Sequence, residues 1–454
     1  RSGCGSPACR GDRSDRRIEK TQSEGEEMKR IIALVLAVCM CFALVACGGN
    51  SDKDSGKKTG AVAYVIAEKG DTYSLGLANN FKTAFEKQGG TVIMETFPKN
   101  TTNFSDYLQK ALDNKADVIF SPNSTTVAAN FLKNADDLGV ECPILAGDTW
   151  ESSVILDAVK GTDLKVYCST FFDENDSSST AASDFVKGFK KWLNDNKNYY
   201  DMNGGNDIVA AVSALGFDAY NVAMAAIRAA AQEKGKNLTS VDVAKALWTL
   251  TYENGVAGTL QFDKNGDAIK DSAYIKQAGD GKFNFVKLQT IKNDATQASA
   301  HDYGDVKGIA LDKASKTITI GIYEPTSGDN AAGGKQEVIG ITYANSLDNK
   351  IKIGDNEYTV KLYLSDNSSL DENAVAAASK IVDEKALISL GSYGSGVSIA
   401  AAETFENAKL PAIGISCTNA SVTAGHDYYF RTCFLDPFQG TVMANFAFDL
   451  INSK

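Results

Sequence analysis

The chain is poor in histidine and has no stripe of clustered basic residues. Only two of its 454 residues are histidines, His301 and His426, and they lie far apart in the sequence. A histidine-rich metal site or a catalytic site built on histidine is therefore not expected, and we interpret both residues as surface or packing residues. The formal net charge is -11. Because phosphate binding needs clustered Lys and Arg, no nucleic-acid partner is expected.

The nine cysteines show no spacing that would hold a metal ion or form a redox pair. Five of them lie within the first 47 residues, and the other four are Cys142, Cys168, Cys417 and Cys433. These four lie in or next to apolar strands, so we interpret them as small buried hydrophobic residues. The sequence does not decide whether two of them form a disulfide. No metal or other cofactor is expected.

Long apolar runs are absent except for one near the beginning of the chain. Residues 31–46 are apolar, follow Met28-Lys29-Arg30 and precede Cys47-Gly48-Gly49. This run is shorter than the about 20 residues of a membrane span. A basic start, a short apolar stretch and small residues at the cut are typical of a secretory signal. The residues Leu44-Val45-Ala46-Cys47 look like a bacterial lipobox, which predicts lipid attachment at Cys47; a buried apolar helix is the less favoured alternative.

The chain of 454 residues, of which 43% are hydrophobic and 23% charged, is long enough for two domains with a core each. The expected segments are a piece upstream of the mature protein (1–27), a lipoprotein signal (28–46), a flexible tether (47–60), one half of the folded part (61–288), a polar linker (289–316) and the other half (317–454).

Short apolar runs alternate with helical patterns in both halves. Leu77, Phe81 and Phe85 recur at helical spacing, and Gly89-Gly90 ends that helix. The predicted strands are 61–66, 91–94, 118–120 and 144–145 in the first half and 317–322, 358–364, 386–390 and 412–415 in the second. Strands that alternate with helices predict βαβ units and mainly parallel sheets, which is an α/β fold. Between the two series, a helix is expected over 215–231 and a hairpin with an Asn-Gly turn over 260–267.

In open parallel sheets, ligands bind beyond the carboxyl ends of the strands. The segments that follow predicted strands are 71–74, 121–126, 147–150, 391–396 and 416–419. Their hydroxyls and the helix N-termini could hold a carboxylate, and Asp148 could pair with an ammonium group, so a zwitterion fits whereas phosphate would need Lys or Arg. The run Gly391–Gly396 matches neither a phosphate-binding loop nor a G-x-S-x-G elbow. This run could form a tight turn between a strand and a helix or contact a ligand, and the sequence favours neither alternative over the other.

At these residues the chain resembles the substrate-binding proteins of branched-chain amino acid ABC transporters, which have the type I periplasmic-binding fold. Segments that resemble the family's N-terminal half are Ile322–Gly328, Leu390–Gly396, Ile415–Asn419 and Phe430–Gly440. Segments that resemble its C-terminal half are Tyr73–Leu77, Asn103–Ser105, Gly147-Asp148, Leu215–Ala219 and Phe262-Asp263. Together they cover nearly all of residues 61–450.

The resemblance implies two Rossmann-like lobes joined by a hinge, with a branched-chain or related amino acid bound between them. It implies that Ser395 and Thr418 hold the ligand carboxylate together with the backbone around Ser416. From the opposite lobe, Tyr73 would close over the ligand and Asp148 would meet its ammonium group.

Two positions depart from the family pattern. Gly333 stands where the family often has an aromatic residue, and Ser124 stands where a tyrosine is often found. Both departures would enlarge or polarise the pocket, with Ser124 as a further ligand contact. The ligand could therefore be an amino acid that is bulkier or more polar than leucine.

The two halves stand in the opposite order from the family, which predicts a circularly permuted fold. One complete set of elements is present, and permutation is tolerated at surface sites. A mis-ordered or truncated gene model explains the order equally well, because the tether would join the strand at Thr317 as naturally as the strand at Ala61.

We expect a monomeric, lipid-anchored, extracytoplasmic protein that captures an amino acid by hinged closure and passes it to the permease subunits of an ABC importer. No bond would be broken, so it is not expected to be an enzyme. A nucleophile at Ser395 or Tyr73 would lack a base nearby in the sequence. The remaining alternatives are the ligand-sensing module of a receptor and a binding protein for another small polar solute, such as an amide.

Overall fold

The structure is a computed structural model that describes residues 60–176 and 179–453. The predicted signal, the predicted lipid site Cys47 and all but the last residue of the predicted tether lie outside these ranges. Within the described ranges, no helix combines the length and the apolar character that crossing a membrane requires.

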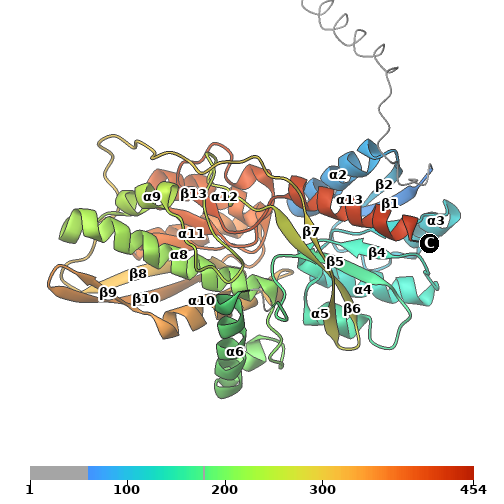
Figure 1. Cartoon of the computed structure of the whole chain (residues 1–454), viewed down its shortest axis with the longest axis horizontal. Helices are drawn as coiled ribbons and strands as arrows, with labels where there is room; N and C mark the ends of the chain where they lie inside the picture. Colours follow the sequence, from blue (N-terminus) through green and yellow to red (C-terminus); the bar gives the residue numbers. More distant parts are fainter. Residues whose placement is uncertain (1–59, 177–178, 454) are drawn as a thin grey trace, which may run out of the picture. The chain divides into compact units, whose positions relative to one another are not determined.

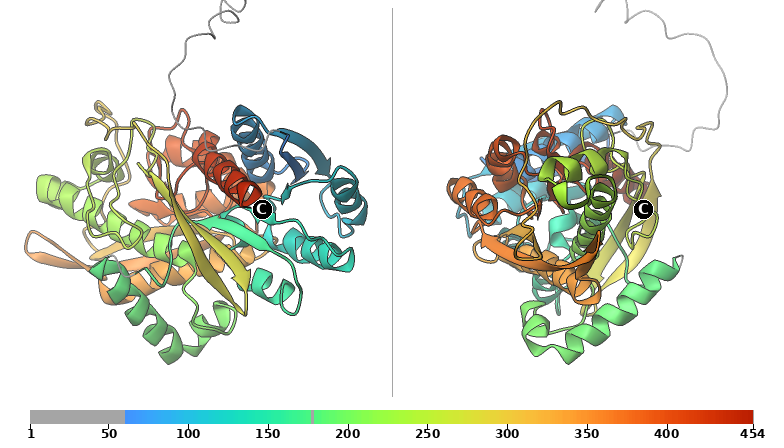
Figure 2. Two further views of the ribbon diagram at one scale, coloured as in Figure 1. Left: turned by 45° about the vertical axis from the view of Figure 1, so that its right-hand side comes forward. Right: turned by 90° about the vertical axis from the view of Figure 1, so that its left-hand side faces the viewer.

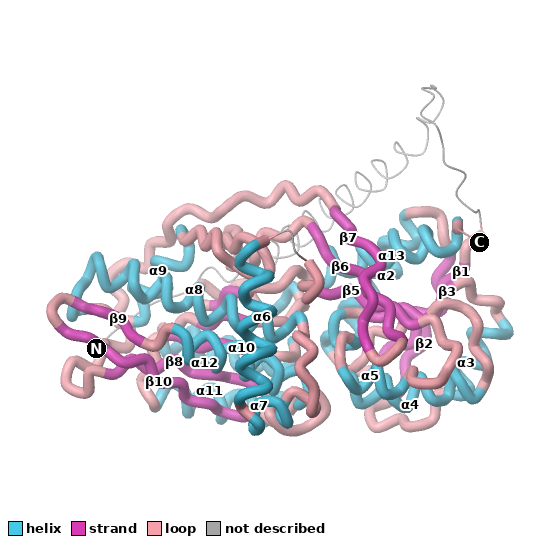
Figure 3. Tube along the Cα trace, turned by 60° about the horizontal axis from the view of Figure 1, so that its bottom comes forward, coloured by secondary structure: helices cyan, strands magenta, loops and turns pink. Residues whose placement is uncertain are grey.

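Two sheets form the framework (Figure 1). The first has the order β2-β1-β3-β4-β5-β6-β7. Its strands are β1 (Val62–Glu68), β2 (Thr91–Phe97), β3 (Val118–Phe120), β4 (Ile144–Ala146), β5 (Val166–Thr170), β6 (Ser272–Gly279) and β7 (Lys282–Thr290). The strands from β2 to β5 are parallel, whereas β6 and β7 form an antiparallel hairpin at one edge (Figure 3).

The second sheet has the order β13-β12-β11-β8-β10-β9. Its strands are β8 (Thr317–Glu324), β9 (Lys350–Ile353), β10 (Asn356–Asp366), β11 (Ile388–Leu390), β12 (Ala412–Gly414) and β13 (Tyr429–Arg431). Only β9 runs antiparallel to its neighbour among these described strands. The central strands are buried on both faces, which explains why they are continuous apolar runs without alternation.

Each sheet with its helices forms one lobe. The helices of the seven-stranded lobe are α2 (Thr72–Lys87), α3 (Ser105–Asp113), α4 (Thr125–Asp137), α5 (Ser153–Ala158) and α13 (Asp436–Asn452). The helices of the six-stranded lobe are α6 (Thr180–Asp195), α7 (Lys197–Met202), α8 (Ala211–Lys234), α9 (Ser240–Thr249), α10 (Ala331–Leu347), α11 (Asp371–Asp383) and α12 (Ser395–Ala408).

The last helix of the chain packs beside the first described one. Helix α13 lies along α2 (Figure 2), with Phe85 and Phe448 stacked at 4.5 Å between ring centroids. The side chain of Gln88 donates a hydrogen bond to Asn445 at 2.9 Å. Segments from the two ends of the sequence therefore build one lobe together.

The α8–α10 contact needs glycine on both helices. A Cβ at Gly216 would lie 2.6 Å from the backbone oxygen of Glu337, and a Cβ at Gly340 would lie 2.1 Å from that of Ser213. Because the backbones approach this closely, α10 holds a fixed position on the six-stranded sheet, and its residue Glu337 becomes important for the site below.

All eight predicted strands are present, and so are the helix expected over 215–231 and the Asn-Gly turn, where Phe262 and Ala268 form a bridge. The predicted α/β fold class with mainly parallel sheets is confirmed; the permuted order stays a prediction. The hairpin β6–β7 was not predicted, because neither strand is a continuous buried apolar run: β6 mixes buried with partly buried residues, and β7 has no buried residue. Strand β7 also extends two residues into the predicted linker, ending at Thr290.

The structure describes His301 and the four later cysteines, which the sequence indicates are packing residues or small buried residues. His301 stacks on the ring of Trp248 with 5.4 Å between ring centroids, which is a packing role. Cys168, Cys417 and Cys433 are buried, Cys142 is partly buried, and no disulfide joins these four described residues.

Candidate functional site

A cleft between the two lobes is lined by residues that follow the carboxyl ends of strands. The seven-stranded lobe contributes Asp71, Tyr73, Ser124, Asp148 and Thr149. The six-stranded lobe contributes Asn330, Ser369, Asp371, Tyr393, residues 394–397 and Ser416. Five of the six residues predicted to bind ligand therefore line one cleft, although they come from distant parts of the sequence. No Lys or Arg belongs to this described lining.

One end of the cleft is formed by the N-terminus of α12. Gly394 precedes this helix with a φ of 111°, and no described side chain caps the first turn. The unbonded N–H groups of a helix N-terminus and its partial positive charge favour an anion. Ser395 accepts a hydrogen bond from the backbone N–H of Asn419 at 3.2 Å, so its own hydroxyl hydrogen can be donated to another acceptor. This end of the cleft is suited to a carboxylate.

The starts of α2 and α4 differ from that of α12 because a side chain caps each of them. Asp71 accepts from the backbone N–H of Ser74 at 2.6 Å, and Ser124 accepts from that of Val127 at 3.4 Å. Ser124 thus lies in the cleft as expected, and its hydroxyl oxygen also caps α4.

Asp148 supplies a buried carboxyl group to the same cleft. It is 3% exposed, and it accepts hydrogen bonds from the Tyr73 hydroxyl at 3.0 Å and from Nε2 of Gln439 at 2.8 Å. A Cβ at Gly147 would lie 2.2 Å from the Tyr73 hydroxyl oxygen, so glycine is needed there for the contact. Burial raises the pKa of Asp148 to about 6, although the hydrogen bonds from Gln439 and Tyr73 lower it.

Ser416 connects the cleft to two further acids that sequence reasoning missed. Its hydroxyl donates a hydrogen bond to Glu337 of α10, and Glu337 in turn interacts with the carboxyl group of Glu324 at the end of β8. Glu324 also accepts from the backbone N–H of Tyr393 at 2.7 Å. Burial raises the pKa of Glu337 to about 8, and burial together with the neighbouring Glu337 raises that of Glu324 well above its usual range. Glu337 directly precedes the apolar run Val338-Ile339-Gly340-Ile341, and an acid beside such a run was the signal that could have identified it.

Thr418 does not belong to the lining of the cleft. It is fully buried, and its hydroxyl lies beside the carboxyl group of Asp436, while its backbone oxygen accepts from the Asp436 N–H at 2.8 Å. Burial raises the pKa of Asp436 to about 7. The structure therefore places Thr418 behind the cleft.

Gly333 does not enlarge the pocket, contrary to expectation. A Cβ at this position would lie 2.2 Å from the ring of Tyr393, which fills the space that a side chain of α10 would take. The ring of Tyr393 lines the cleft instead. The aromatic residue thus comes from the loop after β11 and not from α10.

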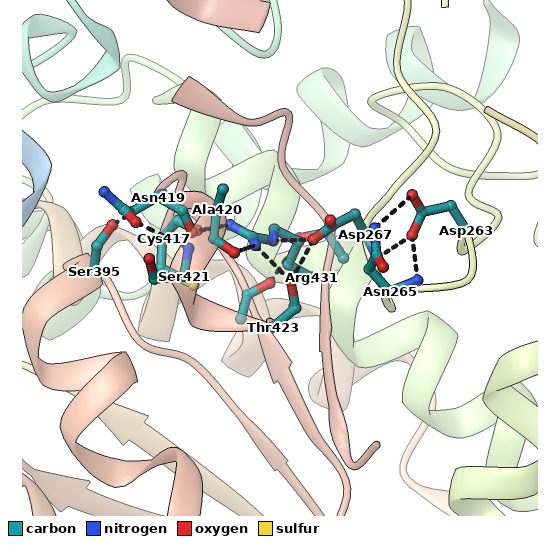
Figure 4. Close-up of polar contacts among 12 residues, drawn as sticks. Asp263, Asn265, Asp267, Ser395, Cys417, Asn419, Ala420, Ser421, Thr423 and Arg431 are labelled. Atoms are coloured by element: carbon teal, nitrogen blue, oxygen red, sulfur yellow. Dashed lines mark hydrogen bonds and ion pairs between the residues drawn. The ribbon is translucent and has the colours of Figure 1, made fainter. Parts of the chain in front are cut away.

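The segment 417–420 is held by a buried arginine (Figure 4). Arg431 is 0% exposed, and its NH1 group donates to the backbone oxygens of Cys417 and Asn419 at 2.8 and 2.7 Å. Its Nε donates to Asp267 at 2.6 Å. Asp267 lies in the predicted turn, which Asp263 closes by accepting from the backbone N–H of Asp267 at 3.1 Å. The turn and the segment beside Ser416 are therefore linked through one guanidinium group.

Metal binding has no support from the described residues, because they contain no group of His, Cys, Asp and Glu side chains arranged around a possible ion.

Known proteins resemble this chain in sequence. A family model described as periplasmic binding protein matches residues 53–282 and 317–451. An amino acid binding protein of Pseudomonas aeruginosa is 32% identical over 139 residues, which are 30% of this chain and 37% of that protein. A Leu/Ile/Val-binding protein homolog of Brucella abortus is 29% identical over 133 residues, 29% of this chain and 36% of that protein.

Solved structures of similar proteins cover more of the chain. A leucine-binding protein of Thermotoga maritima has 26% identity and a TM-score of 0.42, with 50% of this chain and 60% of that chain covered. A branched-chain amino acid transporter substrate-binding protein of Streptococcus pneumoniae, in complex with isoleucine, has 18% identity and a TM-score of 0.36, with 51% and 60% covered. The chain spans little more than a third of the curated relatives named above, 37% and 36% of their lengths.

Proposed function

Because the chain belongs to the periplasmic binding protein family, a family of solute-binding proteins and not of enzymes, we propose that it captures a free amino acid in the cleft between its lobes. The family implies a location outside the cytoplasm. The relatives support an amino acid as the solute, since they are named as amino acid binding and Leu/Ile/Val-binding proteins.

The observation that carries this proposal is the opposite polarity of two parts of one cleft. The uncapped N-terminus of α12 with Ser395 offers hydrogen-bond donors, whereas Asp148 and Ser416 offer acceptors. An α-amino acid carries a carboxylate and an ammonium group on one carbon atom, so it matches both parts at once.

The roles follow from this arrangement. Ser395 and the first N–H groups of α12 hold the carboxylate, and Asp148 pairs with the ammonium group. Tyr73, which donates to Asp148 at 3.0 Å, closes the cleft from the seven-stranded lobe. Thr418 acts from behind the cleft by fixing the backbone that follows Ser416.

The same proposal includes delivery to the permease of an ABC importer and attachment through a lipid on Cys47. Transporter proteins among the similar structures are consistent with the delivery to a permease. The apolar run before Cys47 supports the lipid attachment.

A thermal-shift screen of the purified protein against the twenty amino acids and small amides tests the proposal. A ligand that binds only the folded state raises the melting temperature, and at 100 times its dissociation constant it stabilises the fold by about 2.7 kcal/mol. We expect a clear rise with at least one of leucine, isoleucine and valine. A cooperative melt that no amino acid moves would contradict the proposal, and a rise with amides alone would transfer it to that class of solute.

A further inference from the structure

Two buried glutamates behind Ser416 form an acid pair that the family assignment does not explain. Glu324 ends strand β8, and Glu337 lies in α10, which packs on the same sheet. Both are 0% exposed, the charge of Glu337 raises the pKa of Glu324, and Oε1 of Glu324 and Oε2 of Glu337 have no hydrogen-bond donor among the described groups. A proton held between these two buried oxygens would satisfy both, so we expect the pair to carry at least one proton.

The surroundings of the pair supply donors but no positive charge. The backbone N–H of Tyr393 donates to Glu324, and the hydroxyl of Ser416 donates to Glu337. Asp148 and Cys417 disfavour ionisation of the pair. The other titratable groups that interact with it are Tyr323, Tyr393, Tyr429 and Cys433, none of which is a cation. Among the described residues, no Lys, Arg or His forms an ion pair with either glutamate. A positive charge that arrived in the cleft would therefore be the first one near the pair.

The hydrogen bond from Ser416 to Glu337 determines what Ser416 offers to a ligand. A hydroxyl has one hydrogen and two lone pairs. Because the hydrogen points to Glu337, the oxygen of Ser416 presents its lone pairs to the cleft. Ser416 is therefore an acceptor for an ammonium group and not a donor to a carboxylate.

We propose that Glu337, supported by Glu324, is a second acidic determinant of ammonium recognition, and that ligand binding expels one proton from this pair into the solvent. This inference rests on the proposed function, because it needs a ligand with an ammonium group. The positive charge of that group, bound at Ser416, replaces the positive charge of the proton that leaves. Asp148 of the seven-stranded lobe and the glutamate pair of the six-stranded lobe then bind the same ammonium group.

The direction of the pH effect follows from the same arrangement. Both glutamates have raised pKa values, that of Glu337 about 8, so the unliganded pair still holds a proton near pH 7. A nearby ammonium group lowers the pKa of the pair. Binding that releases a proton becomes tighter as the pH rises, by up to tenfold per unit between about pH 6.5 and 8.

Isothermal titration calorimetry in buffers with different ionisation enthalpies counts the released protons. The probe is the amino acid that raises the melting temperature most in the screen, titrated at pH 7. We expect the unaltered protein to release close to one proton. Glu337→Gln should release none and bind at least tenfold more weakly. In Glu324→Gln, the amide donates to Glu337 and keeps it ionised before binding, so proton release should fall towards zero.

Glu406→Gln is the matched control. Glu406 is a partly buried acid with a raised pKa that lies outside the cleft and accepts from the backbone N–H of Tyr428 at 3.2 Å. This variant should release the same number of protons as the unaltered protein, and thermal melts show that each variant is folded. Binding without proton release, or unchanged affinity in Glu337→Gln, would overturn the inference while the proposed function stands. An unaltered protein that binds no amino acid would overturn both.

Discussion

At the scale of the residue, Asp148 shows how one carboxyl group can weaken the fold and strengthen binding. Its burial raises its pKa to about 6, which means that the unliganded protein holds the charged form at a cost. The donors Tyr73 and Gln439 reduce that cost without removing it. An ammonium group in the cleft would supply the missing opposite charge.

Replacement of Asp148 by asparagine should remove most of the affinity for an amino acid. The substitution keeps the size of the side chain but leaves the ligand's ammonium group without its partner, which costs several kcal/mol for a buried charge. We expect the dissociation constant to rise at least 100-fold, measured by calorimetry at pH 7.5. Asp163→Asn, on the surface far from the cleft lining, serves as the control. Unchanged affinity would contradict the assignment of Asp148.

The same substitution should stabilise the unliganded protein in a pH-dependent way. The folded-state pKa of about 6 lies above the ordinary value of 3.8. The unfolded carboxyl group therefore ionises first as the pH rises, and the contribution of Asp148 to stability is lost between about pH 4 and 6. We expect Asp148→Asn to gain on the order of 2 kcal/mol over the unaltered protein at pH 7.5 and little at pH 4. Urea unfolding at both pH values measures this, and an equal effect at both would show that the charge of Asp148 is not the cause.

At the scale of the element, the loops after the strands are held from behind by buried polar contacts. Arg431 at the end of β13 donates to the backbone of 417–420 and to Asp267, which joins a turn of the chain about 160 residues away to the segment beside Ser416. Removing the guanidinium group leaves the buried carboxylate of Asp267 without its cation and the carbonyl oxygens of Cys417 and Asn419 without this donor.

Arg431→Met should therefore destabilise the fold by about 3–5 kcal/mol, which urea unfolding measures. Arg228→Met is the matched control, because Arg228 pairs with Asp348 at 2.8 Å on the surface, where an ion pair contributes about 0–1 kcal/mol. The double variant with Asp267→Asn should cost less than the sum of the two single variants. Equal losses of unfolding free energy in Arg431→Met and Arg228→Met would show that the buried network stabilises the fold no more than a surface ion pair does.

At the scale of the whole molecule, the chain crosses between the lobes several times, and α13 returns to complete the lobe that contains α2. Each lobe is thus assembled from segments that are distant in the sequence. The contacts within the lobes do not depend on which half of the chain comes first, provided that the connecting segments can span the gaps.

A protein with residues 317–454 placed before residues 61–316, joined by a flexible Gly/Ser linker, should fold to the same lobes and bind the same ligand. We expect a cooperative melt and a ligand-induced rise in melting temperature similar to those of the original order. The control is the original order with the same linker inserted between Gly204 and Gly205, which are exposed in the turn after α7. Loss of folding in the rearranged protein alone would show that the order itself is required.

The sequence by itself determined the two α/β series, the positions of eight strands and the segments that line the cleft. It could do so because parallel strands buried on both faces are continuous apolar runs, and because ligand sites lie where such strands end. The segments that contain Ser395, Ser416, Tyr73, Asp148 and Ser124 were found in this way, whereas the choice of individual residues within them, other than Asp148, came from the family resemblance. The hairpin β6–β7 was missed because it lies at the sheet edge, where one face is exposed and the apolar run disappears.

Only the tertiary structure decided which of these side chains face the cleft and what supports them. Thr418 is placed behind the cleft and the ring of Tyr393 fills the space at Gly333 because packing, not position after a strand, sets the direction of a side chain. Glu324 and Glu337 belong to different elements, and nothing in the sequence brings their carboxyl groups together. They meet because α10 packs on the sheet that contains β8, and it is their shared burial that gives them a chemistry that neither residue has alone.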